Sequence, residues 1–511
     1  MTPSISVGKM KKSGFASCGG SHSPWTPSVE FFVYSWPWLT AIAVLVVNLF
    51  VSGHILFFKR DSRAATAWLA ILWFVPILGA FLYYVLGINR IERRARRLRR
   101  KARRTAVPIK VVGDHPQPKV PPLPNEATHL AHLVQLSTTV TGHPLCEGNT
   151  IEQLWDGDQA YPAMLQAIEG AKHSIGVCMY LFNNDRTGNR FAEALGRAVA
   201  RGVEVRVLID DIGARHYSWR SISGPLQRAG VPSARFLPTF RLRYFAYTNL
   251  CNHRKLMIVD GWLGFTGGMN ITDECWLSLE PAYPVRDLQF RIEGPVVAHM
   301  QEVFVEDWKF TTGERLHGER WFPKLQAQGP TLAHGVSSGP DEDLEKLRLV
   351  LLGALSSART RVVIVTPYFL PDAGLISALN IAALRGVQVD ILLPKDVDLR
   401  LVRWAATAQL WQVLEHGCRV WLTPGPFVHT KLVLVDSVWT LLGSANWDAR
   451  SLRLNFEFNI ECYDPALAAS LEATLGKSLA QAEPVTLAKL HKRPFLVKLR
   501  DLVARLLMPY L

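Results

Sequence analysis

The sequence lacks the short motifs that mark several large classes of enzyme. It contains no HExxH zinc motif and no glycine-rich nucleotide-binding loop of the P-loop type. Its seven cysteines include no CxxC pair and follow no regular spacing, which argues against a disulfide framework and against a cysteine-based zinc site. We therefore expect reduced thiols, no metal ion and no cofactor.

Charged residues are also scarce, at 20% of the 511 residues, and the net charge of +14 is concentrated in one place. The tract Arg90–Arg104 holds ten Lys/Arg and one Glu, so it contributes +9 and the rest of the chain only +5. This distribution does not indicate a nucleic-acid-binding protein, because the remainder is only mildly basic. The hydrophobic content of 49% indicates a folded protein, and a chain of this length needs more than one core.

Two long segments near the amino terminus carry no Asp, Glu, Lys or Arg, namely Trp38–Phe58 and Ala64–Gly87. Each has about the 20 residues that a helix needs to cross the hydrocarbon core of a bilayer. Residues 36–88 are therefore predicted to form a two-helix transmembrane hairpin, joined by the short link Lys59–Arg63. The basic tract after the hairpin and three lysines before it predict that both ends of the hairpin, and all that follows, lie in the cytoplasm.

The rest of the chain divides by composition and by an internal repeat. Residues 1–35 are a predicted amino-terminal tail, and residues 89–125 combine the basic tract with a proline-rich linker. Two similar halves follow, at 126–325 and 326–485. The last segment, 486–511, has the spaced apolar and basic residues of an amphipathic helix, which would either lie on a membrane surface or pack on the globular part.

The strongest signal is a motif that occurs twice. His253–Asp260 (HRKLMIVD) recurs as His429–Asp436 (HTKLVLVD), and the histidines, lysines and aspartates of the two copies are each 176 residues apart. A short apolar stretch and a small-residue turn follow each copy, at Gly267–Asn270 and Gly443–Asn446. Because helices alternate with apolar strands in both halves, we expect an α/β fold of two sandwich halves, related by pseudo-twofold symmetry around one cleft.

The residue types of the repeated motif suit displacement at a phosphate. On a strand, residues two apart share a face, so each histidine and its lysine point the same way, whereas Asp260 has the opposite parity and is expected to be a local strut. Lysines and asparagines would neutralise charge on the phosphate oxygens, while one histidine attacks phosphorus and the other supplies a proton. The predicted catalytic motif residues are His253, Lys255, Asp260, His429, Lys431 and Asp436. The residues predicted to bind the phosphate or to orient the histidines are Gly268, Asn270, Asp287, Ser444, Asn446 and Glu457.

These motifs resemble the two HKD motifs of the phospholipase D superfamily and, within it, the bacterial cardiolipin synthases. The likeness covers nearly the whole chain and includes the segment PYFLPD at Pro367–Asp372. The second apolar segment also resembles the anchor of that family. It has the same arrangement of Trp68, Pro76, Gly79, Tyr83 and Gly87.

The resemblance implies a reaction, its lipids and its location. A histidine would attack one phosphatidylglycerol, glycerol would leave, and a second phosphatidylglycerol would take the phosphatidyl group from the histidine to give cardiolipin. By analogy His253 is the nucleophile and His429 the acid and then the base, although the two halves are nearly equivalent in sequence. The implied location is the bacterial cytoplasmic membrane, with phosphatidylglycerol, cardiolipin and the bilayer as partners.

Three other functions remain open at this point. Another phospholipase D-type phosphatidyltransferase or a lipid hydrolase would share the motifs, because the headgroups are chosen by loops and water is always a possible acceptor. A nuclease would need a basic groove with stacking aromatic residues and would gain nothing from membrane segments. A membrane scaffold would not need the paired histidines. The sequence leaves the oligomeric state undetermined.

Overall fold

The computed structural model describes residues 26–59, 62–87, 121–213, 221–238, 250–340 and 343–506. The chain divides into two compact units, an amino-terminal unit (Met1–Arg90) and a carboxy-terminal unit (Ile91–Leu511). The predicted amino-terminal tail up to residue 25, the basic tract and most of the proline-rich linker lie outside the described residues.

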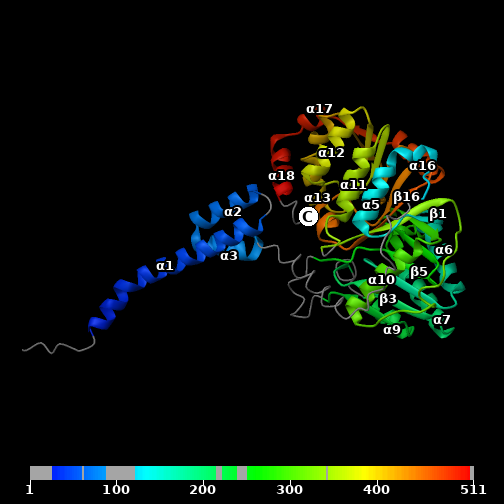
Figure 1. Ribbon diagram of the computed structural model, residues 1–511, viewed down its shortest axis with the longest axis horizontal. Coiled ribbons are helices and arrows are strands. Elements are labelled where there is room, and N and C mark those ends of the chain that lie inside the picture. Colours follow the sequence, from blue (N-terminus) through cyan, green and yellow to red (C-terminus); the bar gives the residue numbers. More distant parts are fainter. Residues whose placement is uncertain are drawn as a thin grey trace, which may run out of the picture. The chain divides into compact units, whose positions relative to one another are not determined.

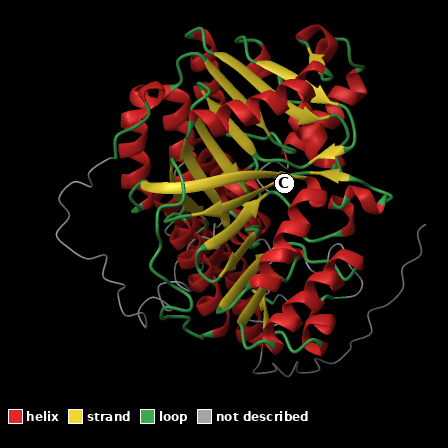
Figure 2. Ribbon diagram, turned by 90° about the vertical axis from the view of Figure 1, so that its right-hand side faces the viewer, coloured by secondary structure: helices red, strands yellow, loops and turns green. Residues whose placement is uncertain are grey.

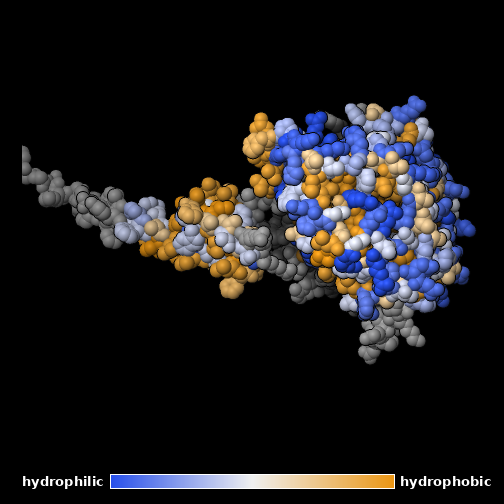
Figure 3. Space-filling model, turned by 90° about the horizontal axis from the view of Figure 1, so that it is seen from above, coloured by the Kyte–Doolittle hydropathy of each residue, from blue (hydrophilic) through white to orange (hydrophobic). Residues whose placement is uncertain are grey.

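The amino-terminal unit consists of helices with mostly apolar surfaces. They are α1 (Thr26–Phe58), α2 (Ser62–Phe74), α3 (Pro76–Leu82) and the π-helical turn η1 (Tyr83–Gly87) (Figure 1). Within the described part of the chain, Ser35–Phe58 of α1 is the one helical stretch that is long and apolar enough to cross a membrane. Hydrophobic side chains cover much of the visible face of these helices (Figure 3). The unit therefore has the surface of a membrane anchor.

The second apolar segment differs from the continuous spanning helix that the sequence predicts. Helix α2 has 13 residues, which at 1.5 Å per residue reach about 20 Å, and a bilayer core is about 30 Å thick. The helix ends because Pro76 has no N–H to donate to the preceding turn and its ring would clash with that turn. The hydropathy of Ala64–Gly87 is thus that of a span, but its backbone is broken in the middle.

Beyond this break the chain turns back along α2. A Cβ atom at Gly79 would lie 2.6 Å from the carbonyl oxygen of Ile71 and 2.8 Å from the Cα atom of Leu72, so only glycine permits this approach. The rings of Trp68 and Tyr83 lie 5.4 Å apart, although 15 residues separate them in the sequence. Helices α2 and α3 therefore form a tight helical hairpin rather than one rod.

The carboxy-terminal unit is built on a mixed sheet of fifteen strands, with a small separate ribbon. The strands of the first half are β1 (Cys146–Trp155), β2 (Ser174–Met179), β3 (Glu204–Asp210), β4 (Ser233–Phe236), β5 (Leu256–Val259), β6 (Leu263–Gly267) and β8 (Leu288–Glu293). Those of the second half are β9 (Thr331–Ser338), β10 (Arg361–Val365), β11 (Gln388–Pro394), β12 (Arg419–Thr423), β14 (Leu432–Val435), β15 (Trp439–Gly443), β16 (Glu457–Tyr463) and β17 (Glu483–Val485). The ribbon pairs β7 (Val285–Arg286) with β13 (Phe427–Val428) in parallel.

The strand order shows the internal duplication directly. Across the sheet it runs β17-β12-β11-β10-β14-β15-β16-β9-β1-β8-β6-β5-β2-β3-β4. From the central antiparallel pair of β9 and β1, equivalent strands follow in the same order in both directions, with β17 added at one edge. The predicted α/β fold with duplicated halves is confirmed, and the pseudo-twofold axis passes between β1 and β9.

Helices cover both faces of this sheet (Figure 2). The longer ones are α5 (Ala131–Thr141), α6 (Asp156–Gly170), α7 (Arg186–Ala200), α10 (Val297–Thr312), α11 (Lys346–Ser357), α12 (Ala373–Leu384), α16 (Pro465–Ala480) and α18 (Phe495–Leu506). The shorter ones are η2 (Asn125–Leu130), α9 (Ser223–Arg228), η4 (Asp273–Cys275), η5 (Leu277–Leu279), α13 (Arg400–Thr407), α14 (Trp411–Leu414), α15 (Ala449–Arg453) and α17 (Leu487–His491).

Three large clusters of buried apolar side chains, and a smaller one beside α13, fill the described part of the unit. One lies between the first half of the sheet and helices α6 and α7, and a second lies between the second half and helices α5, α11 and α12. The third joins the two halves, because β8 and α10 of the first half meet β16 and α16 of the second. This shared core fixes one half against the other, which a site built from both halves requires.

The shared core predicts a large loss of stability on truncation of Phe304. This fully buried ring of α10 stacks on Trp308 and Trp321, with ring centres 6.4 and 6.2 Å away, and fills the space beside Gly176. Phe304→Ala should lower the free energy of unfolding by about 3–5 kcal/mol, as measured by denaturant unfolding in detergent. Ile381→Ala, at a residue that is 55% exposed, is the control and should change it by less than about 0.5 kcal/mol. Equal effects of the two changes would contradict the packing of Phe304 in this core.

Candidate active site

The two motif histidines are each attached by the backbone to the opposite half. His253 lies three residues before the start of β5, and its N–H donates to the carbonyl oxygen of Phe456 at 2.9 Å. His429 lies between β13 and β14, and its N–H donates to the carbonyl oxygen of Arg286 at 2.8 Å. These bonds place each histidine beside the strand that follows the other motif.

The side chains repeat the same exchange between halves. The Nδ1 atom of His253 lies 3.0 Å from both carboxylate oxygens of Glu457, at the start of β16. The Nδ1 atom of His429 lies 2.8 Å from Oδ2 of Asp287, just before β8. Both carboxylates are buried, at 1% exposure or less. A carboxylate on Nδ1 fixes the ring and directs Nε2 away from it, as in other histidines that react through one nitrogen.

The motif lysines lie beside the histidines and are buried as well. Nζ of Lys255 donates to the carbonyl oxygen of His253 at 2.7 Å, and Nζ of Lys431 donates to the carbonyl oxygen of His429. Burial lowers the pKa of Lys255 to about 7 and that of Lys431 to about 8, against the attraction of neighbouring carboxylates. A bound anion would stabilise the charged form of both lysines, so the site favours a negatively charged ligand.

Burial also sets the protonation of the two histidine–carboxylate pairs. It lowers the pKa of His253 to about 4, and the nearby Glu457 offsets this only in part. Burial and the charge of Lys431 lower the pKa of His429. The carboxylates change in the same direction: burial raises the pKa of Asp287 and Glu457, but the adjacent cations and histidines outweigh it and lower both. The site without substrate therefore combines ionised carboxylates with a neutral His253 at pH 7.

The two halves differ at the small-residue turn behind the carboxylates. In the second half, Ser444 Oγ donates to Glu457 at 2.5 Å, and Asn455 Nδ2 donates to the other oxygen at 3.2 Å. In the first half, Gly268 occupies the position of the serine, and a Cβ there would lie 2.5 Å from Oδ1 of Asp287. The glycine is therefore required by the close approach of the carboxylate, and the Asp287 pair has no equivalent hydroxyl donor at that position.

The predicted asparagines are buried close to their motifs. Asn270 accepts from the backbone N–H of Leu181 through its Oδ1 atom at 3.3 Å. Oδ1 of Asn446 has no hydrogen-bond partner in the structure, and this side chain borders a cavity next to Lys431 and Asn459. The cavity volume, about 10 Å³, is room for a single water molecule at most. It is too small for a substrate.

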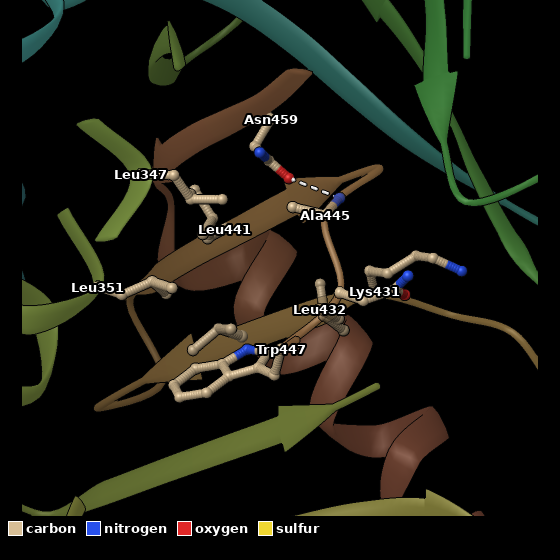
Figure 4. Close-up of a pocket in the computed structure, with 10 residues that line it drawn as sticks. Leu347, Leu351, Lys431, Leu432, Leu441, Ala445, Trp447 and Asn459 are labelled. Atoms are coloured by element: carbon tan, nitrogen blue, oxygen red, sulfur yellow. Dashed lines mark hydrogen bonds between the residues drawn. The ribbon is translucent and has the colours of Figure 1, made fainter. Parts of the chain in front are cut away.

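The surroundings of this cavity separate an apolar side from a polar side. In Figure 4, Leu347, Leu351 and Trp447 lie on one side, and the chain of Lys431 extends away from them. Asn459 accepts from the backbone N–H of Ala445 at 3.3 Å and so holds the turn that follows the second motif. Lys431 therefore starts at the edge of the apolar core, and its side chain extends away from that core.

The structure places Asp260 and Asp436 outside this group. Asp260 accepts from the backbone N–H groups of residues 172–174 at 2.6–3.2 Å, and Asp436 accepts from those of residues 359–361 at 2.8–2.9 Å. Both aspartates also have positive φ angles, 49° and 52°, in the turn at the far end of the motif strand. Their inclusion among the catalytic residues is corrected accordingly, because their oxygens are used to tie the turn to the start of a neighbouring strand.

Several residues near the histidines were not identified from the sequence. The ring of Tyr180 lies edge-on to His253, with ring centres 4.8 Å apart, and Nζ of Lys255 lies 5.1 Å from its centre. Arg254 is fully buried, bonds Asp307 at 2.5 Å and donates to the carbonyl oxygen of Glu457 at 3.1 Å. The repeat of Tyr180 as Tyr368 was a visible signal for the tyrosine, whereas nothing in the sequence marks Arg254 as buried.

The role of the turn aspartates gives a stability prediction. Asp260→Ala and Asp436→Ala should each lower the free energy of unfolding by about 1–3 kcal/mol, because several backbone N–H groups lose the acceptor that fixes the turn. Asp→Asn at the same positions keeps one acceptor oxygen and should lose less. Denaturant unfolding in detergent measures both pairs. Unchanged unfolding midpoints in the two alanine variants would show that these residues do not hold the turns.

Comparison with known proteins places this site in a family. The protein-family model described as "Cardiolipin synthase, PLD-like domain" matches residues 164–308 and 351–478, one match in each half. The model "Phospholipase_D-nuclease N-terminal" matches residues 46–87. A phosphatidylserine synthase from Haemophilus influenzae Rd KW20 has a similar fold, with a TM-score of 0.58 and 15% identity over 74% of this chain and 100% of that chain.

Two curated relatives are similar over almost their whole length. The cardiolipin synthase of Listeria monocytogenes serotype 4a (strain HCC23) is 31% identical over 483 residues, covering 92% of this chain and 98% of that protein. The major cardiolipin synthase ClsA of Bacillus subtilis (strain 168) is 32% identical over 475 residues, covering 91% and 98%. With matches in both halves and in the anchor, the chain belongs to the cardiolipin synthase family of phospholipase D-like proteins.

Proposed function

We propose that the protein is a phosphatidyltransferase that joins two phosphatidylglycerol molecules into cardiolipin and releases glycerol. The observation that carries the proposal is the pair of buried histidines, one from each half, each oriented by a carboxylate of the other half. Two buried lysines beside them favour an anionic ligand. The family relatives support the choice of lipid.

The first half-reaction forms a phosphatidyl-histidine. Nε2 of His253 attacks phosphorus of the first phosphatidylglycerol, and the bond from phosphorus to the glycerol headgroup breaks. His429 gives its proton to the leaving glycerol oxygen. Two features support His253 as the nucleophile: its low pKa keeps the ring neutral, and Ser444 and Asn455 fix its carboxylate partner. Burial and the charge of Lys431 lower the pKa of His429 as well, but Asp287, 2.8 Å from its Nδ1 atom, opposes this lowering and so favours the proton required for the acid step.

The second half-reaction reverses these roles. His429, now neutral, takes the proton from the free hydroxyl of a second phosphatidylglycerol, whose oxygen attacks phosphorus and displaces His253. Lys255 and Lys431 neutralise the charge that develops on the non-bridging oxygens in both steps, with Asn270 and Asn446 as further polar partners. The exchange of one phosphodiester for another has little net driving force, so no nucleotide is consumed and the reaction runs in both directions.

This mechanism predicts that each histidine is indispensable. His253→Ala and His429→Ala should each reduce cardiolipin formation by at least about 10²-fold, because one site needs both the nucleophile and the acid–base group. Purified full-length enzyme in phosphatidylglycerol vesicles, with cardiolipin, glycerol and phosphatidic acid quantified by mass spectrometry, is the assay. His416→Ala, at an exposed histidine, is the matched control and should retain wild-type turnover.

Two results would contradict the proposal. Retention of more than about a tenth of the turnover by either histidine variant would exclude a single shared site, since acid–base groups contribute at least about 10²-fold. Phosphatidic acid as the dominant product would show that water is the preferred acceptor and that the enzyme is a lipid hydrolase.

We also propose how the anchor is placed in the membrane. Helix α1 crosses the bilayer and the segment 62–87 enters it and returns, so that Ser62 and Gly87 lie on the same side. The charge rule alone does not distinguish this arrangement from a two-span hairpin, because three cations precede α1 and three lie in Lys59–Arg63. The close packing of α3 along α2 favours the returning segment. The basic tract Arg90–Arg104 then places the carboxy-terminal unit in the cytoplasm.

Thiol labelling of intact cells tests this placement. Ser62→Cys, in a background without reactive native cysteines, should not react with a membrane-impermeant reagent until the cells are opened. A cysteine tag at the amino terminus should react at once, because α1 alone separates the two positions. The reverse pattern would establish a two-span hairpin with residue 62 outside the cell.

A further inference from the structure

Helix α18 presents an apolar face that the other described residues of the unit leave uncovered. Its outward side chains are Phe495, Leu496, Leu499, Leu502, Val503 and Leu506, with exposed fractions from 46% to 78%. On a helical projection of 100° per residue they occupy one continuous arc of about 120°. Such an arc is typical of a helix that lies against an apolar surface.

Basic side chains border this arc on both sides. On the same projection, Arg500 follows one edge of the arc, and Lys498 and Arg505 lie beyond the other. The single acidic residue of α18, Asp501, is on the opposite side, buried at 1% exposure. An apolar face flanked by cations is the pattern of helices that insert at an anionic lipid surface, because the lipid headgroups attract the cations while the apolar side chains enter the boundary of the hydrocarbon.

The inner side of α18 is fixed to the globular unit. Asp501 bonds Arg493 at 2.6 Å and Arg500 at 2.7 Å, and the guanidinium carbon of Arg500 lies 4.2 Å from the ring centre of Trp404 on α13. Ala504 is buried at 3% exposure against the same helix. The sequence left open whether this segment packs on the globular part or lies on a membrane surface. In the structure α18 packs on the unit and still exposes its apolar face.

The contact between α13 and α18 continues to the active site. Ala504 belongs to a small apolar cluster with Val402 and Tyr368, and Phe427 packs against that cluster. The ring centre of Phe427 lies 5.8 Å from that of His429. Helix α18 is therefore connected to the second histidine through this cluster and Phe427.

We propose that α18, together with the exposed Leu399 and Leu401 at the start of α13, is a docking surface for an anionic lipid bilayer and holds the His429 side of the site at that bilayer. Figure 3 shows a hydrophobic ridge at the edge of the unit where Figure 1 places α18. The proposal uses the proposed function only to identify lipid as the substrate; the binding itself follows from the helix.

Fluorescence quenching in proteoliposomes tests the docking without depending on catalysis. Full-length protein carries an environment-sensitive label at Leu502→Cys, and the control carries it at Ala473→Cys, an exposed position of α16 on another part of the same unit. Brominated phosphatidylglycerol should quench the α18 label at least twofold and leave the control unchanged. Brominated phosphatidylcholine alone should quench the α18 label less, because it does not attract the flanking cations.

Turnover measurements then test the consequence for the site. Leu502→Asp should lower cardiolipin formation in phosphatidylglycerol bilayers at least tenfold but leave turnover of short-chain, monomeric phosphatidylglycerol unchanged. Ala473→Asp introduces the same charge and should change neither. Equal losses on both substrates would indicate a folding defect and overturn the role assigned to α18.

Other outcomes of the quenching experiment also decide the proposal. An α18 label that no lipid quenches, or one whose emission changes with protein concentration in detergent, would mean that water or a second copy covers the face, and would overturn it. Quenching by phosphatidylglycerol in a protein that makes phosphatidic acid instead of cardiolipin would support the docking surface while refuting the proposed function.

Discussion

The pairing of each histidine with a carboxylate from the opposite half is the interaction on which the rest of the structure depends. It requires that β5 and β16, and likewise β13 and β7, stay in a fixed relation although they belong to different halves. The continuous sheet through β1 and β9 and the shared core of α10 and α16 supply that relation. Because an imidazole must be aligned within a few tenths of an ångström to react, the whole unit is organised around two hydrogen bonds.

The same arrangement is symmetric in outline and unequal in detail. Glu457 receives bonds from Ser444 and Asn455, whereas Asp287 faces Gly268 in the equivalent turn. Arg254, buried and paired with Asp307, braces the backbone of Glu457, and the corresponding position in the second motif is Thr430. Glu457, the partner of His253, is therefore held by more side-chain hydrogen bonds than Asp287, the partner of His429. Two chemically identical side chains can therefore take different roles in one reaction.

Much of this was predictable from the sequence, for a definite reason. The repeated HxK pattern predicted that each histidine and its lysine lie close together and that the aspartates lie apart from them. The prediction that they lie on a strand was wrong, because the histidines and lysines lie in the segments just before β5 and β14. The alternation of strand and helix patterns similarly predicted the duplicated α/β fold. Such patterns extend over only a few residues, and the geometry of a strand or a helix determines which side chains share a face.

The remaining features depend on contacts between residues far apart in the sequence, or on a single residue whose effect is lost when hydropathy is averaged over a segment. Equal spacings do not show which carboxylate meets which histidine, since either pairing satisfies them. Buried Arg254 has the side chain of a surface residue, and its burial depends on Asp307, which is 53 residues away. Pro76 was visible in the second apolar segment, but average hydropathy does not register a break in the backbone. The sequence did not decide whether α18 packs on the globular unit or lies on a membrane, because one face of the helix packs on the unit and the other is exposed and apolar.

The exchange of carboxylates between halves also has a consequence for biosynthesis. The ribosome delivers the chain from its amino terminus, so the apolar segments and the first half exist before the second half is made. His253 is complete by then, but Glu457 is still missing, and His429 has not been translated. A nascent chain therefore carries no competent pair, and its reactive chemistry begins only when the last strands close the sheet. Under the proposed function, the partly made protein therefore lacks the pair of histidines that an attack on a lipid requires.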